Sequence, residues 1–410
     1  MTGNVLKRST RLFWIGVIGL ALLEIALVYF IMPMPGSQRM RSLELAYALY
    51  SWRWAARAVL GALVLYGATG AWRRAGRLRA LMPASLVALA ALVYVVNVRM
   101  AADSIFLQPR TLRMVPVTSN RVALDRLVVG VAMDGQAKAY PLQFIGYHHQ
   151  VRDSLAGQPI LVSYCTVCRT GRVFRPTVNG SPETFRLVGM DQFNAMFEDH
   201  TSGSWWRQAN GQAVIGPLKG VAMPELPSVQ VALSQWIALH PTTLVMQADP
   251  AFTSEYAKDY AYERGTKRGG LTGTDTASWQ EKSWVIGVAL NGAAKAWDWK
   301  RLRRDRVIND VVGGVPIVLA LGPDSVSFFA FRRPDANAQF RVVGDSLVAD
   351  VAHYAFNGRG PAGILPAIIN YEHCHLMPAI RHAAWQMLVE RGYRFLEVGK
   401  DTLAVHHAGP

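Results

Sequence analysis

The chain has 410 residues, of which 51% are hydrophobic and only 17% charged, with a formal net charge of +15. This composition predicts a membrane portion joined to a globular one. Residues 1–102 hold 12 Lys and Arg against 2 Asp and Glu, so residues 103–410 carry only +5. The basic charge therefore follows from membrane topology, and it gives no support to a nucleic-acid partner.

Three apolar stretches, at about residues 12–32, 55–72 and 81–98, are each long enough to predict a transmembrane helix. Lys and Arg cluster before the first stretch and between the second and third, which predicts that these two regions are cytoplasmic. We therefore expect a three-helix domain, residues 1–102, in the inner (cytoplasmic) membrane. Its partners would be the lipid bilayer and other membrane subunits, and the soluble part would lie on the extracytoplasmic, periplasmic side.

Glu24 is an acidic residue near the middle of the first stretch. An acid at this depth either serves an ion or proton path or is neutralised by a nearby base. Because no second acid lies in the same span to form a relay, we favour an ion pair with Arg53 or Arg57.

The remaining chain contains an internal repeat at an offset of 157 residues. The segment that begins at Val129 matches the segment that begins at Ile286 without a gap, and the shared residues are mostly Gly, Pro and apolar. In both copies a β-branched run ends in Asp-Gly or Asn-Gly, which is typical of a hairpin. We therefore predict a mainly β (α+β) duplicated domain after the membrane helices.

The predicted domain boundaries follow from this repeat. Copy one spans residues 103–250, a connection spans 251–277, and copy two spans 278–410. Short helices are expected at residues 234–239 and 378–391.

A cluster of cysteine and histidine distinguishes the two copies. Two cysteines, Cys165 and Cys168, and two histidines, His148 and His149, lie in copy one. Copy two has Gly322, Ser325, Asp305 and Arg306 at the corresponding positions. Since the second copy is built without these groups, they indicate a site that belongs to copy one.

Thiolate and imidazole ligands suit copper or zinc. The predicted ligands are Cys165, Cys168, His149 and His148, with Asp153 as a second-sphere partner that orients the imidazole. On this hypothesis the protein handles copper or has a metal-centred redox role.

Two alternatives use the same cysteines. In a thiol-disulfide oxidoreductase, Arg169 and Arg172 would lower the thiol pKa. In a non-enzymatic ligand-binding or assembly protein, the cysteines would form a structural disulfide. The sequence alone does not decide between enzyme and binding protein.

A second polar run has the residue types of a pocket for a small polar ligand. Its members are Asp199, Thr201, Ser204, Trp206 and Gln208. The alternative is a turn network in which Asp and Thr bond their own backbone.

A third candidate site lies near the C-terminus, at His373, Cys374 and His375. On a regular strand Cys374 would face away from the two histidines, which argues against one ion bound by all three.

The order of motifs in the soluble part resembles that of domain of unknown function 3179, an uncharacterised bacterial and archaeal family. The matching positions are Tyr140, Pro141, His149, Asp153, Cys165, Cys168, Asp199, Thr201, Ser204, Trp206 and Gln208. The resemblance covers about residues 121–341. Gln150 and Arg152 depart from the family's Glu and Asn, and Thr-Val replaces the residues between its cysteines. The resemblance implies a fold and an exported location, and no reaction.

Overall fold

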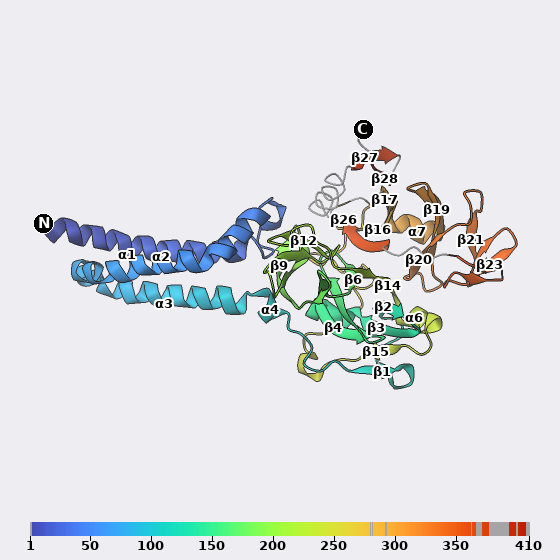
Figure 1. Ribbon diagram of the computed structural model, residues 1–410, viewed down its shortest axis with the longest axis horizontal. Coiled ribbons are helices and arrows are strands. Elements are labelled where there is room, and N and C mark those ends of the chain that lie inside the picture. Colours follow the sequence, from blue (N-terminus) through green and yellow to red (C-terminus); the bar gives the residue numbers. More distant parts are fainter. Residues whose placement is uncertain are drawn as a thin grey trace. The chain divides into compact units, whose positions relative to one another are not determined.

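The computed structural model describes residues 2–278, 280, 282–291, 293–361 and 363–365, and the backbone of three further strands at 371–376, 393–398 and 401–406. The chain divides into two compact units, and each is described by itself (Figure 1). The helical unit comprises Met1–Leu107, Thr184–Arg207 and Gln212–Val221. The sheet unit comprises Gln108–Glu183, Gln208–Gly211 and Ala222–Pro410.

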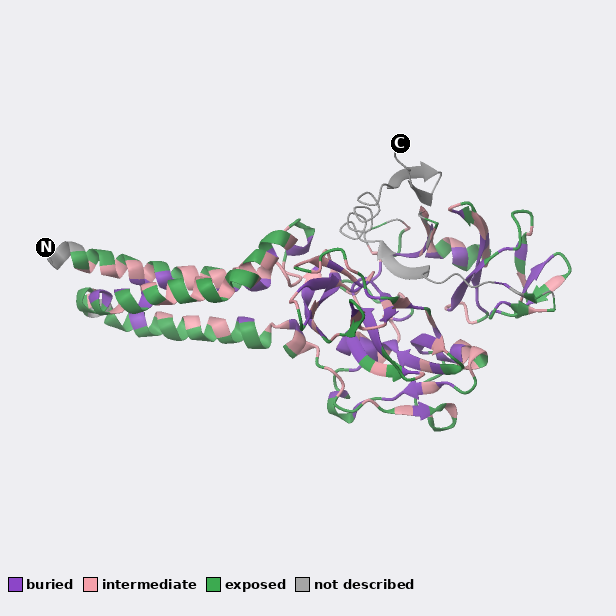
Figure 2. Cartoon of the chain, viewed as in Figure 1, coloured by how far each residue is buried: buried purple, intermediate pink, exposed green. Residues whose placement is uncertain are grey.

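Three long helices dominate the helical unit. They are α1 (Thr2–Tyr29), α2 (Leu43–Ala75) and α3 (Leu81–Tyr94), and α3 continues into a π-helical turn, η3 (Val95–Arg99). Each is long and apolar enough to cross a membrane. Most of their side chains are exposed or half-buried (Figure 2), as expected for helices that a bilayer would cover. The three predicted membrane helices are confirmed.

Small residues allow α1 and α2 to approach closely. A Cβ added at Gly67 would lie 2.5 Å from the backbone nitrogen of Phe13, and one at Gly16 would lie 2.7 Å from the carbonyl oxygen of Leu60. Such contacts between small residues are the usual way in which membrane helices pack.

The helical unit also contains a four-stranded antiparallel sheet. Its strands are β9 (Phe185–Asp191), β10 (Asn194–Asp199), β11 (Trp205–Arg207) and β12 (Gln212–Ile215), in the order β12-β11-β10-β9. This sheet packs on α2, since Ala46 shares a buried cluster with Met196 and Trp205. A short helix, α4 (Ala102–Ile105), leads out of the helices.

Copy one provides two sheets of the sheet unit. The first has the order β1-β15-β3-β2-β14 and consists of β1 (Met114–Pro116), β15 (Leu244–Met246), β3 (Gln136–Pro141), β2 (Leu127–Met133) and β14 (Ser228–Ala232). The second has the order β13-β6-β5-β4 and consists of β13 (Glu225–Leu226), β6 (Thr170–Phe174), β5 (Gln158–Cys165) and β4 (Gln150–Leu155). Helix α5 (Leu142–His148) joins them, and α6 (Leu233–Leu239) confirms the helix expected at residues 234–239.

Copy two repeats the same succession. Its elements are β16 (Ser283–Leu290), β17 (Ala293–Asp298), α7 (Trp299–Asp305), β18 (Val307–Val312), β19 (Val315–Leu321) and β20 (Phe328–Arg332). The bounds of β17, α7 and β18 are those of β3, α5 and β4 moved by 157 residues. The predicted duplication is therefore present in the fold.

The other strands are shorter or lie near the C-terminus. They are β7 (Thr177–Val178), β8 (Ser181–Pro182), β21 (Phe340–Val343), β22 (Ser346–Ala349), β23 (Ala352–Tyr354), β24 (Arg359–Gly360), β25 (Gly363–Ile364), β26 (Tyr371–Leu376), β27 (Tyr393–Val398) and β28 (Asp401–His406). The helix expected at 378–391 lies outside the described residues.

The two copies contribute to a common hydrophobic core, and copy two also has a buried cluster of its own around Trp297 and Leu302. Val129 and Tyr140 of copy one belong to the same buried cluster as Val318 and Phe331 of copy two. The predicted connection contributes to it through Phe252 and Tyr256, so this segment is an integral part of the sheet unit.

Candidate functional site

The two cysteines of copy one lie in the turn of the β5–β6 hairpin. Cys165 ends β5 and pairs with Thr170 at the start of β6, while Cys168 lies in the loop between them. The turn is closed by the backbone N–H of Arg169, which donates to the carbonyl of Cys165 (2.7 Å).

The two cysteines are not joined by a disulfide, and their sulfur atoms are in contact. The Sγ–Sγ distance is 3.1 Å, and the backbone N–H of Cys168 points at Cys165 Sγ (3.4 Å). Cys165 is 0% exposed and Cys168 is 3% exposed. An N–H donor favours the thiolate over the thiol, so Cys165 is the sulfur better placed to hold negative charge.

Arg169 brings a buried positive charge to this hairpin. It adopts a positive φ of 60°, and its guanidinium lies over the rings of Tyr262 (4.0 Å) and Trp284 (4.6 Å). Nη1 donates to Thr274 Oγ1 (2.9 Å), while Nε has no hydrogen-bond partner and no carboxylate among the described residues bonds to the group. A cation held without a bonded carboxylate stabilises a nearby anion, and the adjacent thiols can supply one.

Two tyrosine hydroxyls complete the polar surroundings of the turn. Tyr262 donates to the carbonyl of Thr166 inside the loop (2.8 Å), and its oxygen lies 2.9 Å from that of Tyr164. Burial raises the pKa of Tyr164 to about 12 and that of Tyr262 well above its usual value, so both remain neutral. Both hydroxyls lie within electrostatic range of Arg169 and of Cys165, which places the cation and the sulfur in one neighbourhood.

His149 is the residue that ends helix α5. It has a positive φ of 60°, and its N–H bonds the carbonyl of Ile145 (2.8 Å). Burial lowers the pKa of His149 to about 4, so the imidazole is neutral at pH 7. Its Nδ1 lies 3.1 Å from the carbonyl oxygen of Tyr147, which can only accept, so Nδ1 carries the proton and Nε2 keeps its lone pair.

In copy two, Arg306 occupies the position of His149 and shows which groups a side chain there can contact. Arg306 also ends its helix with a positive φ, of 64°, and its carbonyl accepts from Leu321 as that of His149 accepts from Tyr164. The guanidinium of Arg306 donates to Ser325 Oγ (2.9 Å) and to the carbonyl of Gly322 (3.0 Å). These two residues correspond to Cys168 and Cys165.

Two other residues expected at this site, the predicted ligand His148 and the predicted thiol-activating cation Arg172, have partners elsewhere. His148 is buried, and its Nε2 lies 2.9 Å from Tyr256 Oη. Arg172 bonds the carbonyl of Ala209 (3.0 Å) and lies 3.5 Å from Glu225. Within the described part of the chain, no three or more His, Cys, Asp or Glu side chains come together closely enough to hold a metal ion.

Asp153 bonds the scaffold and not an imidazole. Its carboxylate accepts from Lys138 Nζ (2.8 Å), from Tyr140 Oη (2.6 Å) and from the N–H of Ser154 (2.7 Å). In copy two, Asp310 accepts from Lys295 and Trp297 in the same way. An aspartate with the same role in both copies serves the fold that they share.

The run from Asp199 to Gln208 is divided between the two units. Asp199 accepts from the N–H and hydroxyl of Ser202, from the N–H of Ser204 (3.0 Å) and from Trp206 Nε1 (2.8 Å). These bonds favour the turn network. Thr201 is exposed beside it.

Gln208, in the sheet unit, has a different role. Its Nε2 donates to Ser163 Oγ (3.1 Å) and to the carbonyl of Thr170 (3.0 Å), so it braces the hairpin that carries the cysteines.

The run of His373, Cys374 and His375 lies on strand β26, as the alternation argument assumed. β26 pairs with β16, with Cys374 opposite Val285. The side chains of β26 lie outside the described residues.

Sequence reasoning did not find Tyr262, Thr274 and Trp284, which enclose Arg169. The only signal was the density of tyrosines in the connection, at Tyr256, Tyr260 and Tyr262, which suggested an ordered segment without indicating its partner.

Comparison with known proteins places the chain in a family. Residues 108–381 match the family model described as "Protein of unknown function (DUF3179)". No curated protein and no solved structure matches the chain. Because the matched residues make up more than half of its length, the chain belongs to the DUF3179 family.

Proposed function

We propose that the Cys165–Cys168 pair is a redox-active dithiol in a protein that three helices anchor in the membrane. The observation that carries this proposal is the contact between two sulfur atoms, 3.1 Å apart and not joined by a disulfide, in a turn that also holds the buried cation Arg169. Contact brings the sulfurs within reach of a disulfide, and the cation favours the reactive thiolate.

The chemistry is thiol–disulfide exchange. The Cys165 thiolate attacks a disulfide of a partner molecule, a mixed disulfide forms, and one partner sulfur leaves as a thiolate. Cys168 loses its proton and attacks the mixed disulfide, which releases the second partner sulfur. The protein ends with one disulfide, and the partner gains two electrons and, from solvent and Cys168, two protons.

A soft-metal site is the second candidate, and His149 favours it. Its imidazole is neutral and keeps a lone pair on Nε2, and Arg306 at the equivalent position reaches the counterparts of both cysteines. Copper or zinc would bind Cys165, Cys168 and His149, and the carbonyl of Tyr147 would orient the imidazole.

The extracytoplasmic side is also part of the proposal. The excess of Lys and Arg in the first part of α1, and in the end of α2 with the turn that leads to α3, supports a cytoplasmic N-terminus; three crossings would then place the sheet unit outside. This compartment permits disulfides.

One titration separates the candidates. Full-length Cys374→Ser protein, which retains the pair, is equilibrated in glutathione buffers, and the disulfide is quantified by mass spectrometry of the intact protein. We expect a reversible midpoint between about −120 and −270 mV, the range of catalytic dithiols. A midpoint below about −300 mV would indicate a structural disulfide and overturn the proposal.

The metal site is tested with the same protein, which is reduced under anaerobic conditions and incubated with copper(I) or zinc before the bound metal is measured. Stoichiometric binding that His149→Gln abolishes would favour the metal site over the dithiol. Cys168→Ser is the matched control, because it must eliminate both the disulfide and the metal.

A further inference from the structure

A pocket of about 740 Å³ lies in the helical unit, and every residue that lines it belongs to that unit. Its walls come from α1, α2, the end of α3 with η3, and strands β9 and β10. The apolar part of the lining includes Leu20, Leu27, Trp54 and Val93. The volume suits a ligand of the size that protein pockets commonly hold.

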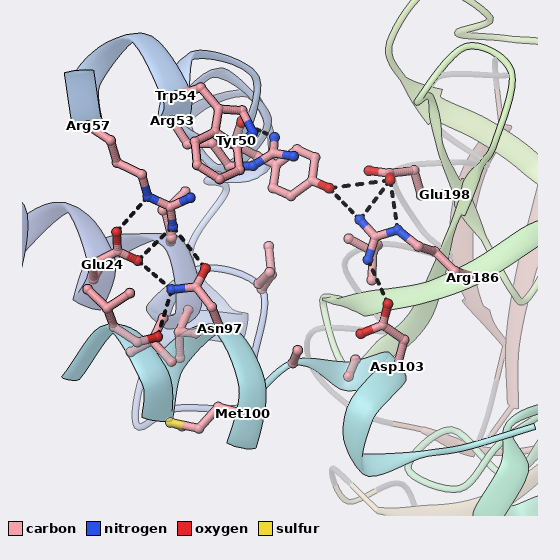
Figure 3. A pocket seen from close by; sticks show the side chains of 18 of the residues that line it. Glu24, Tyr50, Arg53, Trp54, Arg57, Asn97, Met100, Asp103, Arg186 and Glu198 are labelled. Atoms are coloured by element: carbon pink, nitrogen blue, oxygen red, sulfur yellow. Dashed lines mark hydrogen bonds and ion pairs between the residues drawn. The ribbon is translucent and has the colours of Figure 1, made fainter. Parts of the chain in front are cut away.

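In one polar cluster of the pocket the positive charge of Arg57 and the negative charge of Glu24 cancel each other (Figure 3). Arg57 donates to both carboxylate oxygens of Glu24 (2.7 and 2.8 Å), and Asn97 bonds both of these residues (2.8 Å each). The expected pairing of Glu24 is therefore present, with Arg57. This triad ties α1, α2 and the π-helical turn together and leaves no charge for a ligand.

In a second polar cluster the charge of Arg186 is balanced by carboxylates. Arg186 bonds Glu198 (2.7 Å), Asp103 (3.1 Å) and the hydroxyl of Tyr50. Asp103 is 40% exposed, so water screens its charge.

Arg53 is the cation of the pocket that has no carboxylate bonded to it, among lining residues that the structure describes in full. Its guanidinium lies 3.6 Å from the centre of the Tyr50 ring and 5.9 Å from that of Trp54, and it bonds the carbonyl of Tyr50. These contacts orient the group and leave its charge available to an anion.

The same part of α2 has the residues of a membrane interface. Trp52 and Trp54 are 71% and 67% exposed, and Arg53 and Arg57 lie beside them. Arg57 bonds Glu24, five residues before α1 ends at Tyr29, so this part of α2 lies beside the end of a membrane helix. Tryptophan and arginine in such a place commonly lie at the level of the lipid headgroups. A ligand that reaches this pocket from the bilayer therefore presents its headgroup to Arg53 and its chain to the apolar wall.

We propose that this pocket binds a phosphate-bearing lipid, with the phosphate at Arg53 and the apolar chain along Leu20, Leu27 and Trp54. Guanidinium and phosphate form charge-assisted, bidentate hydrogen bonds, and the low dielectric at the membrane surface strengthens them. The lipid is either a bilayer phospholipid or a polyprenyl phosphate, which share this headgroup chemistry.

The test uses the full-length protein in detergent after delipidation, with binding followed by native mass spectrometry and by the shift of thermal unfolding. The probes are phosphatidylglycerol, a polyprenyl monophosphate, diacylglycerol, a prenyl quinone and inorganic phosphate. We expect the two phosphate-bearing lipids to bind more tightly than the other probes. The one that binds more tightly shows whether the ligand is a bilayer phospholipid or a polyprenyl phosphate. Equal binding of diacylglycerol or the quinone would overturn the proposal, as would inorganic phosphate binding as tightly as the lipids.

Substitutions then locate the headgroup. Arg53→Gln should weaken the binding of phosphate-bearing lipids by about tenfold or more, because a charge-assisted bidentate contact is lost. Arg74→Gln is the matched control, since Arg74 is an exposed arginine in the last turn of the same helix, and it should bind as the wild type does. Arg53→Lys keeps the charge and should bind with intermediate strength. Unchanged binding in Arg53→Gln would refute the role of Arg53; if that variant does not fold, the order of wild type and Arg53→Lys decides.

Discussion

Asp153 and Asp310 offer a direct test of whether a polar group serves the scaffold or the site. Asp153→Asn removes the charge that bonds Lys138 Nζ at 2.8 Å and Tyr140 Oη at 2.6 Å. Tyr140 is fully buried, and the side chains of Lys138 and Asp153 are 12% and 11% exposed, so water replaces little of what is lost. Since a hydrogen bond to a charged group is worth about 1.5–3 kcal/mol and an amide keeps part of the geometry, we expect a loss of about 2–4 kcal/mol.

The duplicated copy supplies the control. Asp310→Asn removes the same interactions with Lys295 (2.8 Å) and Trp297 (2.8 Å), and the Lys295 and Asp310 side chains are 16% and 20% exposed. We expect a similar but somewhat smaller loss, measured as the free energy of unfolding in urea by tryptophan fluorescence. Thiol alkylation at Cys165 and Cys168 should not change in either variant. The reasoning would be refuted if Asp153→Asn kept its stability but changed thiol reactivity or metal binding. Asp153 would then belong to the thiol or metal site.

Three further predictions address the hairpin and its surroundings. Arg169→Met should raise the pKa of the reactive thiol by about one unit or more, seen as a shift of the alkylation rate to higher pH, whereas Arg169→Lys should restore most of the wild-type profile. Gly130→Ala should destabilise the sheet unit by about 1–3 kcal/mol in thermal unfolding, because the new Cβ would lie 2.3 Å from the Trp236 ring; an undiminished melting temperature would contradict the packing. The folded-state pKa of His149 is about 4 and lies below its unfolded value, so its contribution is present above pH 6.5 and is lost as the pH falls toward 4. The loss should reach about 3 kcal/mol, and His149→Gln should flatten that part of the stability–pH curve.

Much of the fold follows from local patterns in the sequence. Apolar length predicts the three helices, and the 157-residue repeat predicts the succession of β3, α5 and β4 in copy two. The two residues between Cys165 and Cys168 leave both cysteines in one turn, where their sulfur atoms are in contact. The repeat also pairs Asp153 with Asp310, and an aspartate kept in the copy without cysteines is better explained by the scaffold than by a metal.

The rest of the site depends on contacts that no local pattern carries. Tyr262 meets Tyr164 across 98 residues of chain, and Trp284 reaches Arg169 from the first strand of the other copy. Likewise, nothing in the residues of β9–β12 signals that they pack with the membrane helices. Such pairings are decided by the tertiary structure, so sequence reasoning can name Arg169 as a cation near the thiols without knowing what encloses it.

The sheet β9–β12 has a consequence for how this protein can change in evolution. The family model begins at residue 108, beyond the three helices, yet Trp205 and Met196 inside the matched region are buried against Ala46 of α2. A lineage that exchanged its anchor for another membrane segment would leave these side chains uncovered. Relatives with a different anchor should therefore carry compensating substitutions at or opposite Trp205.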